Sequence, residues 1–148
     1  MNHGLHPSFW AALSGWFVAQ TIKMVCCLVE SKRLDFSYMV STGGMPSAHS
    51  AMASALATSL GLCQGFDSAI FALGVAFAVV VMFDAQSVRK AAGEQAKLLN
   101  QIVDELLHTH RFSETKLKEL LGHTRFEVFM GMLTGIAAAF AAFRYIHP

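Results

Sequence analysis

The most apolar segment of the chain is AIFALGVAFAVVVMFDA, residues 69–85, and its single charge is Asp84 near the end. A bilayer core requires roughly 20 mostly apolar residues per helix. Three further segments come close to this pattern, at 9–29, 48–63 and 126–146. The segment 48–63 is short and rich in Ala and Ser, so we expect it to pack against other helices rather than against lipid. The sequence therefore predicts about four membrane spans.

The composition of the whole chain also favours a membrane protein. Of its 148 residues, 54% are hydrophobic and 14% are charged, whereas a soluble domain carries about 25% charged residues. The mean hydropathy is +0.46. The net charge of +1 gives no reason to expect a nucleic-acid partner. We predict one domain, residues 1–148, folded as an all-α integral membrane bundle.

The distribution of basic residues predicts the orientation in the membrane. Four spans place the loops 30–47 and 86–125 on one side, and both termini with the turn 64–67 on the other. The first side carries nine Lys and Arg residues, whereas the other carries only Arg144. The positive-inside rule therefore places the two long loops in the cytoplasm and both termini on the opposite side.

The longer of these loops, 86–122, is expected to be helical rather than a flexible linker. Apolar residues recur on one face of 87–107, which predicts an amphipathic cytoplasmic or interfacial helix. Ser113 is then expected to cap a short helix that ends near Leu121.

A G-x-x-x-G spacing, Gly131 and Gly135, lies in the last predicted span. Such spacing permits close approach of another helix backbone, although it also arises often by chance.

The first motif that suggests chemistry is GGMPSAHS, residues 43–50. The glycines, Gly44 among them, free the backbone, and we expect Pro46 and Ser47 to start a helix. A helix start offers unpaired N–H groups and a positive dipole end, which together suit an anion. Ser47 adds a hydroxyl donor and His49 an imidazole. The alternative is an ordinary loop-to-helix cap.

The second motif is GHTRFE, residues 122–127, at the start of the last span. His123 and Glu127 are four residues apart and therefore meet on one helical face. A carboxylate bonded to one ring nitrogen fixes the tautomer and makes the other nitrogen a better nucleophile or base. The alternatives are a polar cluster at a helix start and, more weakly, a metal site.

Charged residues at the same predicted depth complete the candidate set. Lys23 lies inside the first span, where an ionisable residue is costly and often functional, although it could also snorkel to the interface. Asp84 and Arg89 lie where the third span meets the cytoplasm, and an arginine there suits a forked grip on phosphate or a simple anchor. Cations, imidazoles and helix starts from all four spans therefore converge on one side, as a phosphoryl-transfer site requires.

These motifs resemble those of the type 2 phosphatidic acid phosphatase and vanadium-dependent haloperoxidase superfamily. Residues 46–49 resemble its Pro-Ser-Gly-His motif, and His123 with Glu127 resembles its His-x3-Asp pair. The stretches 43–50, 84–95 and 120–128 resemble the patterns of a divergent bacterial and plant branch. The resemblance implies a helical membrane phosphatase that needs no metal and no cofactor.

The resemblance also implies roles for individual residues. His123 would attack phosphorus, Glu127 would orient its ring in place of the usual Asp, and His49 would protonate the leaving oxygen and then activate water. The implied substrate is a phospholipid, a phosphate monoester of the phosphatidylglycerophosphate or phosphatidate type. The expected substrate-binding residues are Lys23, Gly44, Ser47, Asp84 and Arg89.

The chain departs from the superfamily pattern in its arginines. The first motif, Lys-x6-Arg-Pro, lacks its arginine after Lys23, so Arg33, Arg89 and Arg125 are rival phosphate ligands. The superfamily fold has about six helices, and a homo-oligomer would complete that architecture. Two other functions stay open: a non-catalytic subunit that binds lipid headgroups, and a metal-dependent phosphotransferase.

Overall fold

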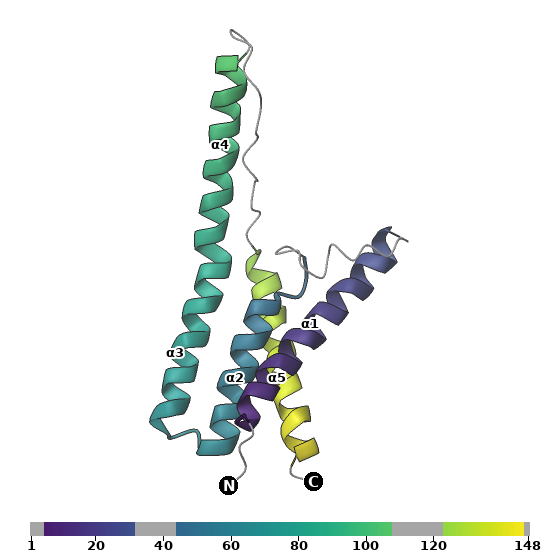
Figure 1. Cartoon of the computed structure of the whole chain (residues 1–148), viewed down its shortest axis with the longest axis vertical. Coiled ribbons are helices and arrows are strands. Elements are labelled where there is room, and N and C mark those ends of the chain that lie inside the picture. The colour runs from purple at the N-terminus through teal and green to yellow at the C-terminus, as the bar shows by residue number, and fades with distance from the viewer. Residues whose placement is uncertain (1–4, 32–43, 108–122, 147–148) are drawn as a thin grey trace.

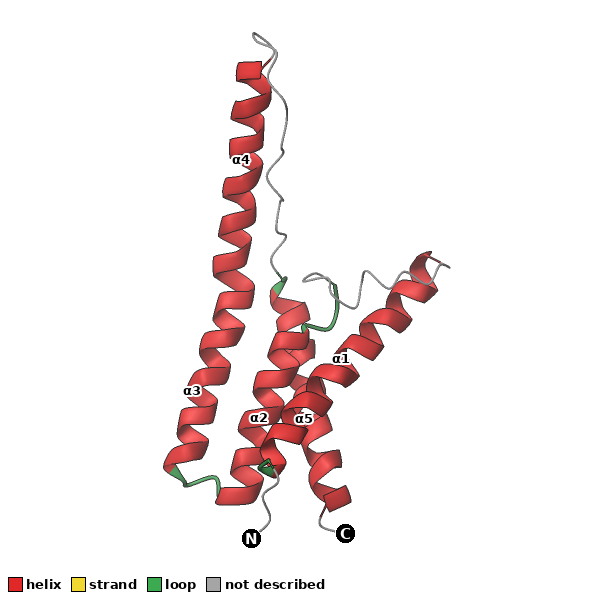
Figure 2. Ribbon diagram, in the orientation of Figure 1, coloured by secondary structure: helices red, strands yellow, loops and turns green. Residues whose placement is uncertain are grey.

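The computed structural model describes residues 5–31, 44–107 and 123–146. All secondary structure in these ranges is helical (Figure 2). The elements are α1 (Pro7–Ser31), α2 (Ala48–Gln64), α3 (Ala69–Phe83), the π-helical turn η2 (Asp84–Val88), α4 (Arg89–Leu107) and α5 (Arg125–Ile146). The predicted all-α class is confirmed.

Helix α2 forms the centre of the bundle and packs against α1, α3 and α5. Its buried residues are all Ala, Ser or Gly, so neighbouring backbones approach it closely. A Cβ on Gly131 would collide with the carbonyl oxygen of Ser47, and one on Gly135 with the carbonyl oxygen of Ala51. The G-x-x-x-G of α5 therefore makes the close helix contact that its spacing permits.

Three helices in the described part of the chain are long and apolar enough to cross a membrane: Pro7–Val29, Ala69–Val103 and Arg125–Tyr145. The remaining predicted span forms α2, whose 17 residues are enclosed by the other helices. This confirms that the segment packs on protein rather than on lipid. The chain is an integral membrane protein by these features.

The third predicted span, residues 69–85, is continuous with the helix that follows it. Helix α3 passes through η2 directly into α4, which continues beyond the bundle (Figure 1). At about 1.5 Å per residue, the helix from 69 to 107 is about 58 Å long, roughly twice the hydrocarbon thickness. The chain has no proline between these residues, so nothing in the backbone chemistry ends the helix at the membrane surface. The predicted amphipathic helix is present as α4, whereas the short helix after Ser113 lies outside the described residues.

The helix ends are arranged as the four predicted segments require. Both termini and the turn between α2 and α3 lie at one end of the bundle (Figure 1). The end of α1, the starts of α2 and α5, and η2 lie toward the other. The candidate site residues that the structure describes belong to this second end, which we call the site end. Its orientation toward the cytoplasm stays a prediction.

Candidate active site at the starts of α2 and α5

Helix α5 begins with a capping box that fixes the Glu127 carboxylate. The backbone N–H of Thr124 donates to Glu127 Oε2 at 3.0 Å, and the backbone N–H of Glu127 donates to Thr124 Oγ1 at 3.3 Å. These reciprocal bonds satisfy two N–H groups that a helix start otherwise leaves unpaired. The bond from the Thr124 N–H therefore holds the Glu127 carboxylate in place independently of its contact with His123.

The same carboxylate oxygen holds the imidazole of His123. His123 Nδ1 lies 2.9 Å from Glu127 Oε2, and the His123 residue is 2% exposed. Since a carboxylate only accepts, Nδ1 donates, and in the neutral ring the lone pair lies on Nε2. Nε2 is buried and has no hydrogen-bond partner among the described residues. A buried polar atom of this kind is rare and requires an explanation.

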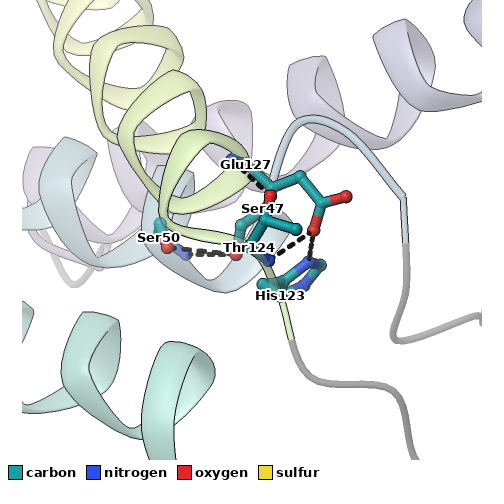
Figure 3. A network of polar contacts seen from close by, with 5 residues as sticks. All are labelled: Ser47, Ser50, His123, Thr124 and Glu127. Atoms are coloured by element: carbon teal, nitrogen blue, oxygen red, sulfur yellow. Dashed lines mark hydrogen bonds and ion pairs between the residues drawn. The ribbon is translucent and has the colours of Figure 1, made fainter. Parts of the chain in front are cut away.

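The start of α2 is fastened to the start of α5. The backbone N–H of Ser47 donates to the carbonyl oxygen of Glu127 at 3.0 Å. Ser47 is fully buried, and its hydroxyl oxygen lies 3.4 Å from the Ser50 N–H and 3.0 Å from the Ser50 hydroxyl, accepting from both (Figure 3). Ser47 is thus the N-cap of α2, and Pro46 precedes the helix instead of starting it. The expectation of Pro46 in the first turn is wrong because the Ser50 bonds place the cap at Ser47.

Lys23 of α1 enters the site from the side of the glycine loop. It is 3% exposed although it carries an ammonium group. A Cβ on Gly44, where φ is +90°, would lie 3.6 Å from Cγ and from Cδ of Lys23, so the loop backbone runs along the lysine stem. The Glu127 carboxylate attracts the Lys23 charge. Lys23 is therefore enclosed by protein next to the His123–Glu127 pair.

The turn η2 reaches the site through the backbone. The N–H of His123 donates to the carbonyl oxygen of Ala85 at 3.1 Å. The half-buried Asp84 opens this turn, one residue before Ala85. Asp84 therefore lies one peptide away from the residue that holds His123.

The other candidates belong to the same end but are less closely tied to the pair. His49 is exposed in the first turn of α2, and Arg125 is exposed at the start of α5. Arg89 is the first residue of α4, although its side chain lies outside the description, as does all of Arg33. The structure brings Lys23, Gly44, Ser47, His123 and Glu127 together directly.

Sequence reasoning missed three contributors. The capping role of Thr124 was readable from the Thr-x-x-Glu pattern. The Ser50 bonds to Ser47 are local to the start of α2, three residues apart. The bond that the Ala85 carbonyl accepts had no comparable signal, because it depends on how η2 and α5 meet. Within the described ranges, no group of three or more His, Cys, Asp or Glu residues is placed to hold a metal ion.

Comparisons with known proteins identify the family of the chain. The sequence pattern of a family described as "Divergent PAP2 family" matches residues 5–138. The chain is 44% identical over 137 residues to an uncharacterized membrane protein, YuiD, of Bacillus subtilis (strain 168), covering 85% of this chain and 87% of that protein. No solved structure matches. The match reaches all four helices of the bundle and includes every candidate residue, and the chain therefore belongs to the divergent PAP2 family.

Proposed function

We propose that the protein is a membrane phosphatase that hydrolyses a lipid phosphate monoester through a phosphohistidine on His123. The observation that carries the proposal is the buried His123–Glu127 pair, with Nδ1 bonded at 2.9 Å and Nε2 left without a described partner. A histidine whose Nδ1 is fixed by a carboxylate and whose Nε2 lone pair is unused has the arrangement of an activated nucleophile.

The proposed reaction has two steps. In the first, the Nε2 lone pair attacks phosphorus, the bond between phosphorus and the ester oxygen breaks, and His49 donates a proton to that oxygen. In the second, His49 takes a proton from water as the water oxygen attacks phosphorus, the P–N bond breaks, and inorganic phosphate leaves. Glu127 stabilises the positive charge on the His123 ring in both steps.

Binding of the phosphoryl group is assigned to groups around this pair. The Lys23 ammonium neutralises phosphate charge, and the Ser47 hydroxyl and the N–H groups near Gly44 at the start of α2 donate hydrogen bonds. Arg89 and Asp84 are proposed to complete the site from the helix 69–107. A buried lysine with a carboxylate neighbour is a costly arrangement in a membrane helix, which favours a functional over a purely structural role.

The substrate class follows from the position of the site. Helices α1 and α5 are long and apolar enough to cross a membrane, and the site lies at one end of the bundle that they form with α2 and α3. At the ends of membrane-spanning helices, lipid headgroups are the neighbouring polar groups. We therefore propose phosphatidylglycerophosphate or phosphatidate as substrate, each with a terminal phosphate monoester at this level.

The test is release of inorganic phosphate by the detergent-purified chain in excess EDTA. The substrates are phosphatidate, phosphatidylglycerophosphate and a prenyl phosphate, and His123→Ala is assayed beside the wild type. Release that vanishes in the variant and is inhibited by vanadate, a mimic of pentavalent phosphorus, supports the proposal. Release that requires added Mg²⁺ overturns the proposed route in favour of a metal-dependent transferase. No release from any substrate, together with binding of phosphatidate vesicles, favours a headgroup-binding subunit.

A further inference from the structure

The turn η2 interrupts the long helix at the level of the site. Its backbone follows π geometry, in which N–H groups bond five residues back, so the turn holds one residue more than an α-helical turn. Such turns are rare within α-helices and often lie at functional sites. Here the turn begins directly after α3, the most apolar helix of the described part of the chain.

The contact that η2 makes is specific. Ala85 is 1% exposed, and its carbonyl oxygen accepts the His123 N–H at 3.1 Å. A carbonyl oxygen has two lone pairs, so Ala85 can accept this bond in addition to one from its own helix. The bond joins residues that lie far apart in the chain and connects the helix 69–107 to the residue that precedes the Thr124 cap.

His123 is consequently held from two independent elements. The capping box and Glu127 hold its ring and the following peptide from α5. The Ala85 carbonyl holds its own N–H from the other helix. His123 precedes the first turn of α5. Without the bond to Ala85, its backbone would therefore be free to rotate.

On its α3 side, η2 is attached to a helix that is firmly packed in the bundle. Helix α3 is packed on α2 through Ala53, Ala57 and Ala78, with Val81 and Met82 against them. Beyond η2, the main contacts of α4 with other described elements are with η2 itself. The π turn therefore links a firmly packed helix to His123.

We infer that η2 is a positioning element for the nucleophile: its extra residue directs the Ala85 carbonyl to His123 and keeps the imidazole in its buried place. The catalytic part of this inference rests on the proposed function. The positional part does not, and it has its own measurement.

The test removes the extra residue. Deleting Gln86 allows the turn to become α-helical, whereas deleting Gln101 shortens the same helix equally but leaves η2 intact. Each full-length chain, in detergent, is treated with diethyl pyrocarbonate, and the modification of each histidine is followed by mass spectrometry. The exposed His6 and His49 serve as internal standards.

We expect His123 to be modified slowly in the wild type and in the Gln101 deletion, because its Nε2 is buried. Deletion of Gln86 should raise its rate at least about tenfold, since loss of a structural restraint exposes the ring by local opening. In the phosphatase assay the same deletion should lower kcat about 10²-fold, as expected when a reacting group is misplaced by about 1 Å.

The outcomes are separable. If the Gln86 deletion labels His123 at the wild-type rate, the inference is wrong. If labelling rises but the wild type releases no phosphate, the positional inference stands and the proposed function fails. Should the deletion not fold, Ala85→Leu, which crowds the buried side of the turn, must raise His123 labelling, whereas the same change at the exposed Ala92 of α4 must not.

Discussion

Two histidines precede helices at opposite ends of the bundle, and their ring nitrogens are used in opposite ways. His6 lies directly before α1 and is exposed. Its Nδ1 accepts the Ser8 N–H at 3.3 Å, and its Nε2 lies 3.4 Å from the Gln64 side-chain amide. His123 is buried, donates through Nδ1 to Glu127, and has an Nε2 without a described partner.

The difference separates a structural histidine from a reactive one. In His6 the Nδ1 lone pair accepts the Ser8 N–H and caps a helix, so the ring proton lies on Nε2 and no lone pair is left over. In His123 the carboxylate fixes the proton on Nδ1, and the lone pair remains available at Nε2. Both histidines lie close to a helix start; their burial and the partner of Nδ1 distinguish them.

The largest effect is expected from a variant that removes the unused lone pair on Nε2 of His123. His123→Asn keeps a side-chain N–H donor for Glu127 but has no atom in place of Nε2. We expect phosphate release to fall at least about 10³-fold, as when a nucleophile is deleted. His6→Asn should leave release within about twofold of wild type, because no step uses His6. Equal losses of phosphate release in the two variants would show that His123 has no chemical role that His6 lacks.

The next effect tests the partner of Nδ1. Glu127→Gln retains an oxygen for the capping box, since Gln and Glu both serve there, but removes the charge that stabilises a cationic ring. We expect kcat to fall about 10²-fold or more. The matched change at the other end, Gln64→Ala, removes a partner of His6 and should not alter kcat. A Glu127→Gln enzyme with wild-type kcat would exclude an electrostatic role for Glu127.

Sequence patterns predicted the local parts of this arrangement. The apolar segments gave helices close to their expected bounds, with 48–63 forming α2 at Ala48–Gln64. The i,i+4 spacing of His123 and Glu127 correctly predicted their contact, because both ends of that bond lie in one helix start. Their catalytic roles stay predictions.

What the sequence could not predict depends on distant parts of the chain meeting. The passage of α3 through η2 into α4 was missed because hydropathy marks where a membrane ends, not where a helix does. The hold on His123 by Ala85, and that on Ser47 by the Glu127 carbonyl, are backbone bonds. Since nearly every residue offers the same backbone groups, no residue type predicts these two bonds.

A smaller effect comes from the helix cap Thr124, which lies between His123 and Glu127 in the chain. Thr124→Ala removes the Oγ1 that accepts the Glu127 N–H, a loss typically of about 1 kcal/mol. If all of it loosens Glu127 in the transition state, kcat falls about fivefold. Thr124→Ser keeps the hydroxyl and should restore wild-type kcat. A loss of equal size in Thr124→Ser would trace the effect to the methyl group rather than to the cap.

The smallest effect lies at the other end and concerns stability alone. His6→Ala removes the acceptor for the Ser8 N–H, and we expect the free energy of unfolding to fall by about 0.5 kcal/mol, the lower limit for a lost N-cap. His6→Asn supplies a side-chain oxygen in the same place, so its unfolding temperature should stay at or above that of the wild type. Phosphate release at a temperature where all three chains are folded should be the same. If His6→Asn is as unstable as His6→Ala, the imidazole contributes through packing, and the cap assigned to Nδ1 is wrong. If instead His6→Ala loses activity while remaining folded, the bundle transmits changes from the α1 start to the site end, and the two histidines are not independent.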